Sequence, residues 1–152
     1  MNPPRRSLRK AILWGGLVAG TVDIGAASLI NWLSPVFIMQ VIASGVLGKP
    51  SYQGGPSSAV LGLVLQWAMS ILIAAIYVLA AARISRLGRH WVPGGLLYGV
   101  VVYFVMTYVV VPLSAAGLSH GFSLRSFIEN MLAMLVFGLI VAFFQRRFAY
   151  RS

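Results

Sequence analysis

Long apolar runs alternate with short polar connections along the chain. Four of these runs are long enough to cross a hydrocarbon core of about 30 Å, which takes roughly 20 residues of helix. They cover 11–33, 58–82, 94–115 and 127–144. The pattern therefore predicts an all-α polytopic membrane protein with four transmembrane helices in a single membrane domain over 1–152.

A shorter apolar segment, 35–48, separates the first two runs. It is followed by Lys49, Pro50 and the turn-rich residues 53–56. Apolar stretches of about 10 to 14 residues are too short to cross a bilayer as a helix. We expect this segment to form a short interfacial helix on the outer face of the bundle, with a re-entrant segment as the alternative.

The composition agrees with a membrane protein. Hydrophobic residues make up 59% of the chain and charged residues 9%, whereas a soluble domain carries roughly 25% charged residues. The mean hydropathy is +0.88. The chain has no cysteine, which excludes disulfides, thiolate metal sites and cysteine nucleophiles.

The net charge is +10, and most of the basic residues stand in clusters at the ends of the apolar runs. Clusters of Lys and Arg at the ends of apolar runs are typical of the positive-inside rule, whereas a nucleic-acid-binding domain gathers them on one continuous surface. Placing both termini in the cytoplasm puts ten of the 12 basic residues inside and two outside. The inner clusters are Arg5, Arg6, Arg9 and Lys10, then Arg83, Arg86 and Arg89, then Arg146, Arg147 and Arg151, and the outer residues are Lys49 and Arg125.

The first run has an alternative interpretation as a cleaved signal. Residues 5–8 resemble a twin-arginine signal, and the small residues 25–27 resemble a cleavage site. However, Asp23 would interrupt the apolar region just before the cut, and removal would leave three spans with unbalanced charge. We therefore interpret the run as a retained span.

A short internal similarity relates the two halves of the chain. The residues GGLVAG at 15–20 recur as GGLLYG at 94–99, and both runs point outward in the predicted topology. Aligning Arg83 with Arg146 places Gln66 on Glu129 in the inward-running helices. This pattern suggests a 2+2 parallel repeat related by an axis along the membrane normal. A chance match of glycine-rich membrane segments is the alternative.

Asp23 is the most informative residue, because the chain contains only one other acidic side chain, Glu129. An ionisable side chain within the bilayer costs several kcal/mol unless it faces a partner or a water-filled cavity. Asp23 shares a helix face with Gly16 and Gly20, at the spacing of small-residue packing motifs. It is therefore expected to face another helix. The expected packing glycines are Gly16, Gly20, Gly95 and Gly99, and the intramembrane polar candidates are Asp23, Gln66, Ser70, Tyr103 and Glu129.

These candidates have structural as well as functional interpretations. Asp23 fixes helix register as a hydrogen-bonded carboxyl, or it takes part in proton or cation movement. Glu129 follows Arg125 by four residues, so an i,i+4 ion pair accounts for it. His90 and His120 fall on opposite membrane sides and cannot share a metal within one subunit. The serines and histidines form no recognisable catalytic or metal-binding motif, so we expect no enzyme activity, metal or cofactor.

Several short motifs resemble the YagU-type bacterial inner-membrane proteins. The resemblance covers roughly the last two-thirds of the chain and the glycine-rich opening at 16–20. It implies a bacterial inner-membrane location and a link to acid resistance. Gln66 and Met134 stand where that family carries histidines, which argues against a histidine-based proton or metal function here. The motifs are Ser70-Ile71, Ala75-Ile76-Tyr77, Gly95-Leu96-Leu97-Tyr98-Gly99 and Val111-Pro112-Leu113, followed by Glu129 and the ending Arg146-Arg147.

The sequence thus favours a small integral membrane protein without enzymatic activity, which serves as a structural or accessory component of the membrane. The alternative is a minimal transporter or channel for protons or small ions that uses Asp23. The expected partners are the lipid bilayer and either further copies of the chain or a larger membrane complex, and nucleic acid is not expected.

Overall fold

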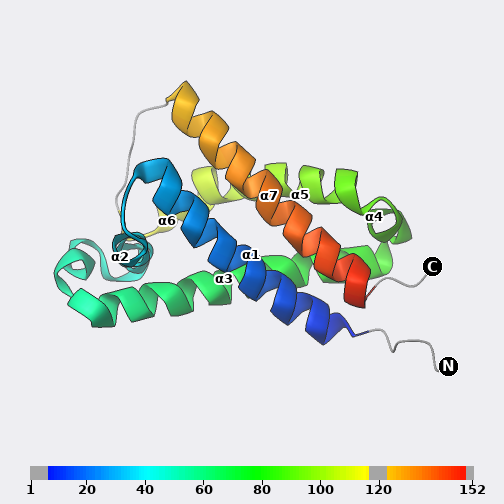
Figure 1. Ribbon diagram of the computed structural model, residues 1–152, viewed down its shortest axis with the longest axis horizontal. Coiled ribbons are helices and arrows are strands. Elements are labelled where there is room, and N and C mark those ends of the chain that lie inside the picture. The colour runs from blue at the N-terminus through cyan, green and yellow to red at the C-terminus, as the bar shows by residue number, and fades with distance from the viewer. Residues whose placement is uncertain (1–6, 117–122, 150–152) are drawn as a thin grey trace.

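The computed structural model describes residues 7–116 and 123–149, and these residues form helices and short connections (Figure 1). Four helical segments are long and apolar enough to cross a membrane. This confirms the predicted all-α fold with four spans. The segments are α1 (Leu8–Asn31), α3 (Gly55–Arg83), the continuous run Trp91–Leu113 and α7 (Leu124–Phe148).

The third span is built from three consecutive helical elements. It begins as α5 (Trp91–Val105), continues through a π-helical turn, η2 (Met106–Val110), and ends as α6 (Val111–Leu113). Pro112 lacks a backbone N–H, so it cannot donate to the preceding turn. The wide turn and the proline therefore give this end of the span a backbone unlike that of a regular α-helix.

The shorter apolar segment forms α2 (Pro35–Leu47), as expected for a helix too short to span. The Ser34 side chain accepts a hydrogen bond from the Phe37 amide at 3.2 Å and caps its start, and Gly48 ends it with a φ of +68°. A 3-10 helix, η1 (Lys49–Gln53), leads from it into α3. Because α2 packs on α3 beside the tight contact of Gly62 with Met39, it lies against the bundle.

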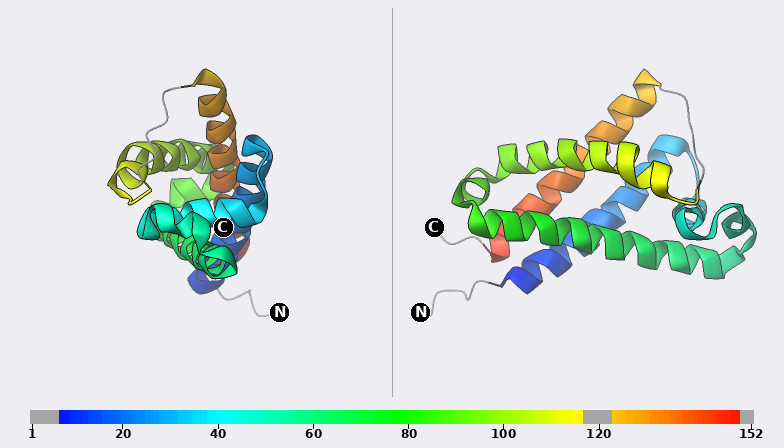
Figure 2. Two further views of the ribbon diagram at one scale, coloured as in Figure 1. Left: turned by 90° about the vertical axis from the view of Figure 1, so that its left-hand side faces the viewer. Right: turned by 180° about the vertical axis from the view of Figure 1, so that it is seen from behind.

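The four spans pack side by side in the order α3, α1, α7, α5. α3 packs on α1, α1 on α7, and α7 on α5, while α3 and α5 run apart over most of their length (Figure 2). The 2+2 repeat remains a prediction. The glycine pairs correspond, because Gly16 and Gly20 of α1 pack on α3, and Gly95 and Gly99 of α5 pack on α7. A twofold repeat would also match the packing of α1 on α7 with packing of α5 on α3, and these two helices do not pack together in the same way.

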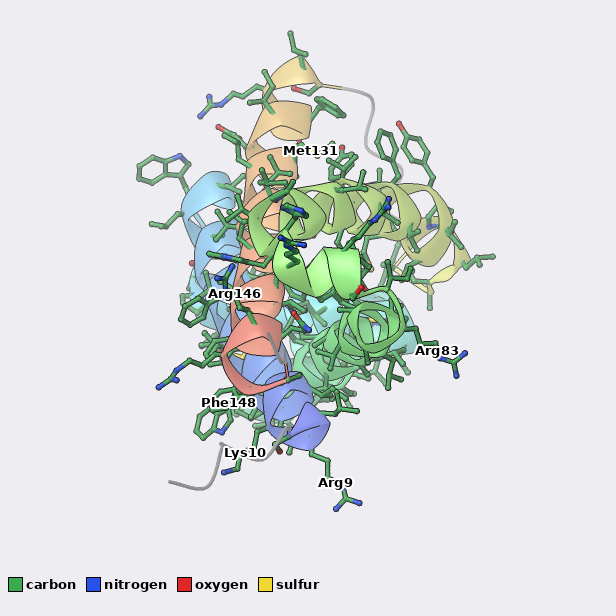
Figure 3. All side chains as sticks on the ribbon, turned by 90° about the vertical axis from the view of Figure 1, so that its right-hand side faces the viewer. Arg9, Lys10, Arg83, Met131, Arg146 and Phe148 are labelled. Atoms are coloured by element: carbon green, nitrogen blue, oxygen red, sulfur yellow. The ribbon has the colours of Figure 1, made fainter. Side chains whose placement is uncertain are left out.

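The start of α1, the end of α7 and the short helix α4 (Ser85–Arg89) lie together at one end of the bundle, here called the terminal end (Figure 1). The Ser7 amide donates to the Phe148 carbonyl at 2.9 Å, which ties α1 to α7 there. Figure 3 looks onto this end. Its described basic residues are Arg9, Lys10, Arg83, Arg86, Arg89, Arg146 and Arg147, whereas Lys49 and Arg125 lie toward the other end, and Arg5, Arg6 and Arg151 lie outside the described residues.

This distribution of charge predicts the orientation in the membrane. Reporter fusions at the N-terminus, after Arg89 and at the C-terminus should report cytoplasm, because basic clusters are retained on that side. Fusions beside Lys49 and within 117–122, next to His120, should report the opposite compartment. An external C-terminus would contradict this orientation.

A core of buried side chains lies in the terminal half of the bundle. Tyr77 is 1% exposed and Phe137 3%, and small residues from α1, α3 and α7 surround them. The Tyr98 hydroxyl donates to the Ile73 carbonyl at 2.6 Å and joins α5 to α3. Small residues allow membrane helices to approach closely, which supplies packing contacts where water exclusion is not available. This core contains Ala19, Ala74, Tyr77, Ala81, Phe137, Val141 and Ala142.

Candidate functional site

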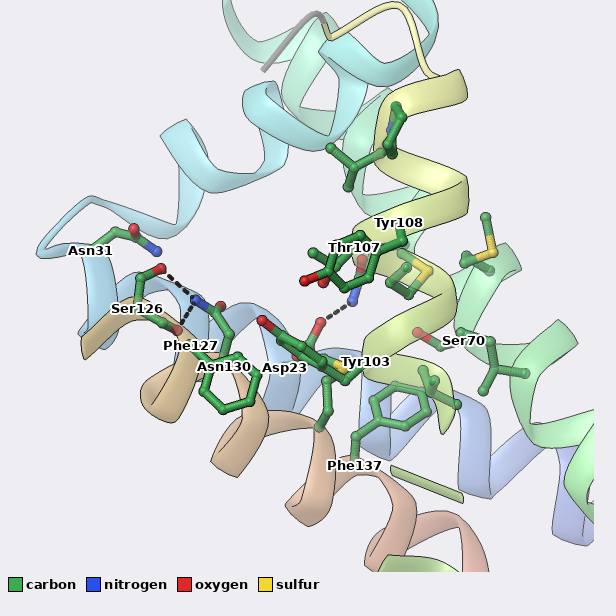
Figure 4. Close-up of a pocket in the computed structure, with 18 of the residues that line it drawn as sticks. Asp23, Asn31, Ser70, Tyr103, Thr107, Tyr108, Ser126, Phe127, Asn130 and Phe137 are labelled. Atoms are coloured by element: carbon green, nitrogen blue, oxygen red, sulfur yellow. Dashed lines mark hydrogen bonds between the residues drawn. The ribbon is translucent and has the colours of Figure 1, made fainter. Parts of the chain in front are cut away.

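A cavity of about 1140 Å³ lies in the half of the bundle away from the terminal end (Figure 4). It lies between the third span on one side and the other three spans on the other. Its lining residues belong to α5, η2 and α6 and to α1, α3 and α7. Its polar side chains come from five of these elements. They are Asp23, Asn31, Gln66, Ser70, Tyr103, Thr107, Tyr108, Ser123, Ser126 and Asn130.

Asp23 is the acidic residue of this cavity, and Gln66 is its partner. The Gln66 Nε2 donates to Asp23 Oδ2 at 2.8 Å and lies 3.4 Å from the Gly20 carbonyl oxygen. The other carboxyl oxygen of Asp23 accepts no hydrogen bond from the residues that the structure describes. Asp23 is half-buried, so the carboxyl borders open space while one oxygen stays anchored.

The position of this pair follows from the packing of α1 on α3. A Cβ at Gly16 would lie 2.6 Å from the Ile71 Cα, and one at Gly20 would lie 2.5 Å from the Ser70 Oγ. Only glycine allows so close an approach of the two backbones. Asp23 follows Gly20 by about one helical turn, and Gln66 precedes Ser70 by about one turn, so the close contact brings both side chains within hydrogen-bonding distance.

The structure brings together four of the five predicted polar candidates. Asp23, Gln66, Ser70 and Tyr103 all line the cavity. Glu129 does not: it borders a separate apolar groove of about 330 Å³ between α1 and α7, to which Asp23 also contributes. The Arg125 Nε lies 2.9 Å from Glu129 Oε1, which is the i,i+4 ion pair expected from the sequence.

Asn130 and Ser126 also line the cavity, and neither is among the polar candidates predicted from sequence. The Asn130 Nδ2 donates to the Ser126 carbonyl at 2.8 Å and lies 3.1 Å from the Ser126 Oγ. Ser123 is the N-cap residue of α7, and Ser126 and Asn130 follow it at spacings of three and four residues, which place all three on one helix face. This spacing of polar residues in the sequence could have predicted a polar face at the start of the helix.

The cavity ends toward the terminal end against the packed core. Phe137 and Ile73 line its floor, and Phe137 also belongs to the core. Beyond it, the Tyr77 hydroxyl and the Gln145 Oε1 are buried without a hydrogen-bond partner among the described residues. The cavity is therefore closed toward the terminal end in this conformation.

The π-helical turn forms one side of the cavity. Met106, Thr107 and Tyr108 of η2 line it. π-helical turns inside α-helices occur frequently at functional sites, because the extra residue in the turn shifts the side chains that follow. Here the turn belongs to the span that diverges from the other helices.

The described residues contain no group of three or more His, Asp or Glu side chains placed to hold a metal ion. His90 is exposed at the start of α5, at the terminal end, and His120 lies outside the described residues. The cavity therefore depends on carboxyl, amide, hydroxyl and aromatic groups.

Comparison of the chain with protein-family models, with curated proteins and with solved structures gives no match. The resemblance to YagU-type proteins stays a prediction.

Proposed function

We propose that this protein is a minimal membrane transporter that binds a proton or a small cationic solute at Asp23. One observation supports this most directly: the carboxyl of Asp23 borders a cavity of about 1140 Å³, and one of its oxygens accepts no hydrogen bond from the described residues. Intramembrane carboxyls that face cavities commonly mark ion or substrate pathways. A carboxyl with a purely structural role would be expected to lie between packed helices.

The location of the other charges supports a cationic rather than an anionic solute. Among the residues that the structure describes, no Lys, Arg or His side chain lines the cavity. The described basic residues lie at the ends of the spans, and Glu129 is paired with Arg125. Asp23 is therefore the charge that a solute in the cavity would meet, and a low-dielectric environment strengthens its attraction for a positive charge.

The shape of the cavity supports access from one side at a time. Its lining residues lie in one half of the bundle, and the core containing Tyr77 and Phe137 closes the other half. In the predicted orientation the cavity belongs to the outer half. Release to the cytoplasm would then require separation of the helices around that core, as in alternating access. We propose a bacterial inner membrane as the location, following the resemblance.

A flux measurement tests the proposed role of Asp23. Full-length protein in liposomes should speed the decay of an imposed proton or sodium gradient, and Asp23→Asn should return the rate to that of empty vesicles. Asn keeps the size and hydrogen-bonding capacity of the side chain but cannot ionise. Among the described residues, the other titratable groups near Asp23 are Tyr103 and Tyr108 in the cavity and Glu129 across the groove, so Glu129→Gln is the matched control. Equal rates for wild type and Asp23→Asn would contradict the proposal.

The second candidate is a structural role, favoured by the hydrogen bond between Asp23 of α1 and Gln66 of α3. In that case Asp23→Asn should retain all function, and Asp23→Leu should destabilise the bundle by about 1 to 3 kcal/mol, because Gln66 loses the shorter of its two hydrogen bonds. Thermal unfolding in detergent measures this difference. A structural or accessory protein would show the Leu effect without any flux that depends on Asp23.

A further inference from the structure

We infer that the cavity binds an organic monovalent cation with an aromatic or otherwise apolar body, rather than an inorganic ion alone. This inference rests on the proposed function and specifies the class of solute. It follows from the size of the cavity, from the side chains around Asp23, and from the separation of positive charge from the site.

The size of the cavity exceeds the needs of a bare ion. Pockets for drug-sized ligands measure about 300–1,000 Å³, and this cavity measures about 1140 Å³. An inorganic cation is bound best by several oxygen ligands arranged closely around it. Here Asp23 and its partner Gln66 lie at one side of a much larger space, which leaves room for a molecule of many heavy atoms.

The aromatic lining suits a cation. Tyr108 of η2 and Phe127 of α7 border it with exposed or half-buried rings, whereas Tyr103 of α5 and Phe137 of α7 border it with rings that are largely buried (Figure 4). The rings of Tyr103 and Phe127 meet edge to face, with centroids 5.4 Å apart, and so connect the two helices across the cavity. A cation within about 6 Å of an aromatic face is attracted by the ring quadrupole, and the attraction grows when water is excluded.

The methionines of the lining provide adaptable apolar contacts. Three of the chain's six methionines, Met69, Met106 and Met134, line the cavity and come from α3, η2 and α7. Methionine has a flexible, polarisable side chain and is common on surfaces that accept ligands of varied shape. The apolar body of the solute would therefore contact aromatic rings and thioethers, while its positive charge lies toward Asp23.

The neighbouring groove provides a contrast within the same protein. It measures about 330 Å³ and is lined mainly by aliphatic side chains such as Val22, Leu29 and Leu132. A lipid chain would suit that groove. The cavity instead presents amide and hydroxyl groups from Asn31, Asn130 and other residues, and these suit a ligand that carries charge.

Binding of tetraphenylphosphonium, an aromatic monovalent cation, tests the inference. Purified full-length protein in detergent should bind it saturably, as measured by equilibrium dialysis at pH 8. Asp23→Asn should weaken binding at least about tenfold, which corresponds to about 1.4 kcal/mol. Tyr108→Leu should weaken it several-fold, because Tyr108 is 62% exposed and its loss removes a ring from the lining without opening the core. Glu129→Gln should bind as wild type, and neutral triphenylphosphine oxide should bind far more weakly.

The outcomes separate this inference from the proposed function. Wild-type protein that supports proton or sodium flux through Asp23 but binds no tetraphenylphosphonium would overturn the inference and leave the proposed function standing. Absence of both flux and binding would overturn both. Equal binding by wild type and Asp23→Asn, or by the neutral analogue, would reveal partition into an apolar space and would also overturn the inference.

Discussion

Replacing Gly16 with leucine should abolish the folded bundle, whereas the same change at Gly25 should be tolerated. A Cβ at position 16 would lie 2.6 Å from the Cα and 2.8 Å from the amide nitrogen of Ile71, so it would meet backbone atoms that cannot move aside. At Gly25 no atom of another described helix lies within 4 Å of the added Cβ. We expect Gly16→Leu to cost at least about 4 kcal/mol, which is exceptional for a single substitution.

Size-exclusion profiles after heating in detergent measure this difference, because separated helices aggregate while the folded bundle elutes as one peak. Gly20→Leu should be intermediate, since the nearest atoms to its added Cβ belong to the short Ser70 side chain. Similar stability of the Gly16, Gly20 and Gly25 variants would show that α1 does not pack on α3 through this face.

Placing tryptophan at Thr107 should stop transport without unfolding the protein. Thr107 lies on η2, is exposed and lines the cavity, so a large ring there would occupy space in front of Asp23 (Figure 4). We expect solute flux to fall at least about tenfold, equivalent to about 1.4 kcal/mol in an activation barrier. Flux in liposomes and thermal stability in detergent are measured on the same preparation.

Val109→Trp is the matched control, because Val109 belongs to the same π-helical turn and is 49% exposed but does not line the cavity. It should transport as wild type. If both tryptophan variants lost flux equally, the effect would come from disturbance of the π-helical turn and not from blockage of the cavity.

The parts of the structure that depend on helical periodicity were predictable from sequence. Gly16, Gly20 and Asp23 share one face of α1 by their spacing, and Gln66 and Ser70 share one face of α3. The structure places these faces against each other. The approximate limits of the spans were also predictable, although α1 begins at Leu8 because the Ser7 side chain caps it, which an apolar run does not reveal.

The cavity was not predictable from sequence, because empty space depends on how far neighbouring helices separate. The cavity lies beside η2, where a π-helical turn replaces regular α-helix after Val105, whereas the preceding α5 packs on α7. The residues of η2 differ little in composition from those of the preceding turns. The same limit applies to Glu129 and Asn130, which are adjacent on α7 yet border different spaces.

The crossing of α5 and α7 restricts how this chain can change over evolutionary time. A Cβ at Gly95 would lie 2.9 Å from the Gly138 carbonyl oxygen, and one at Gly138 would lie closer still to the Gly95 carbonyl oxygen. A Cβ at Gly99 would meet the carbonyl oxygen of Met134 on α7. A larger residue at any one of these positions forces the helices apart and leaves the other two without their close contact. Related sequences that keep the crossing should therefore carry small residues at all three positions or replace them together, whereas Gly25, with open space around it, is free to drift.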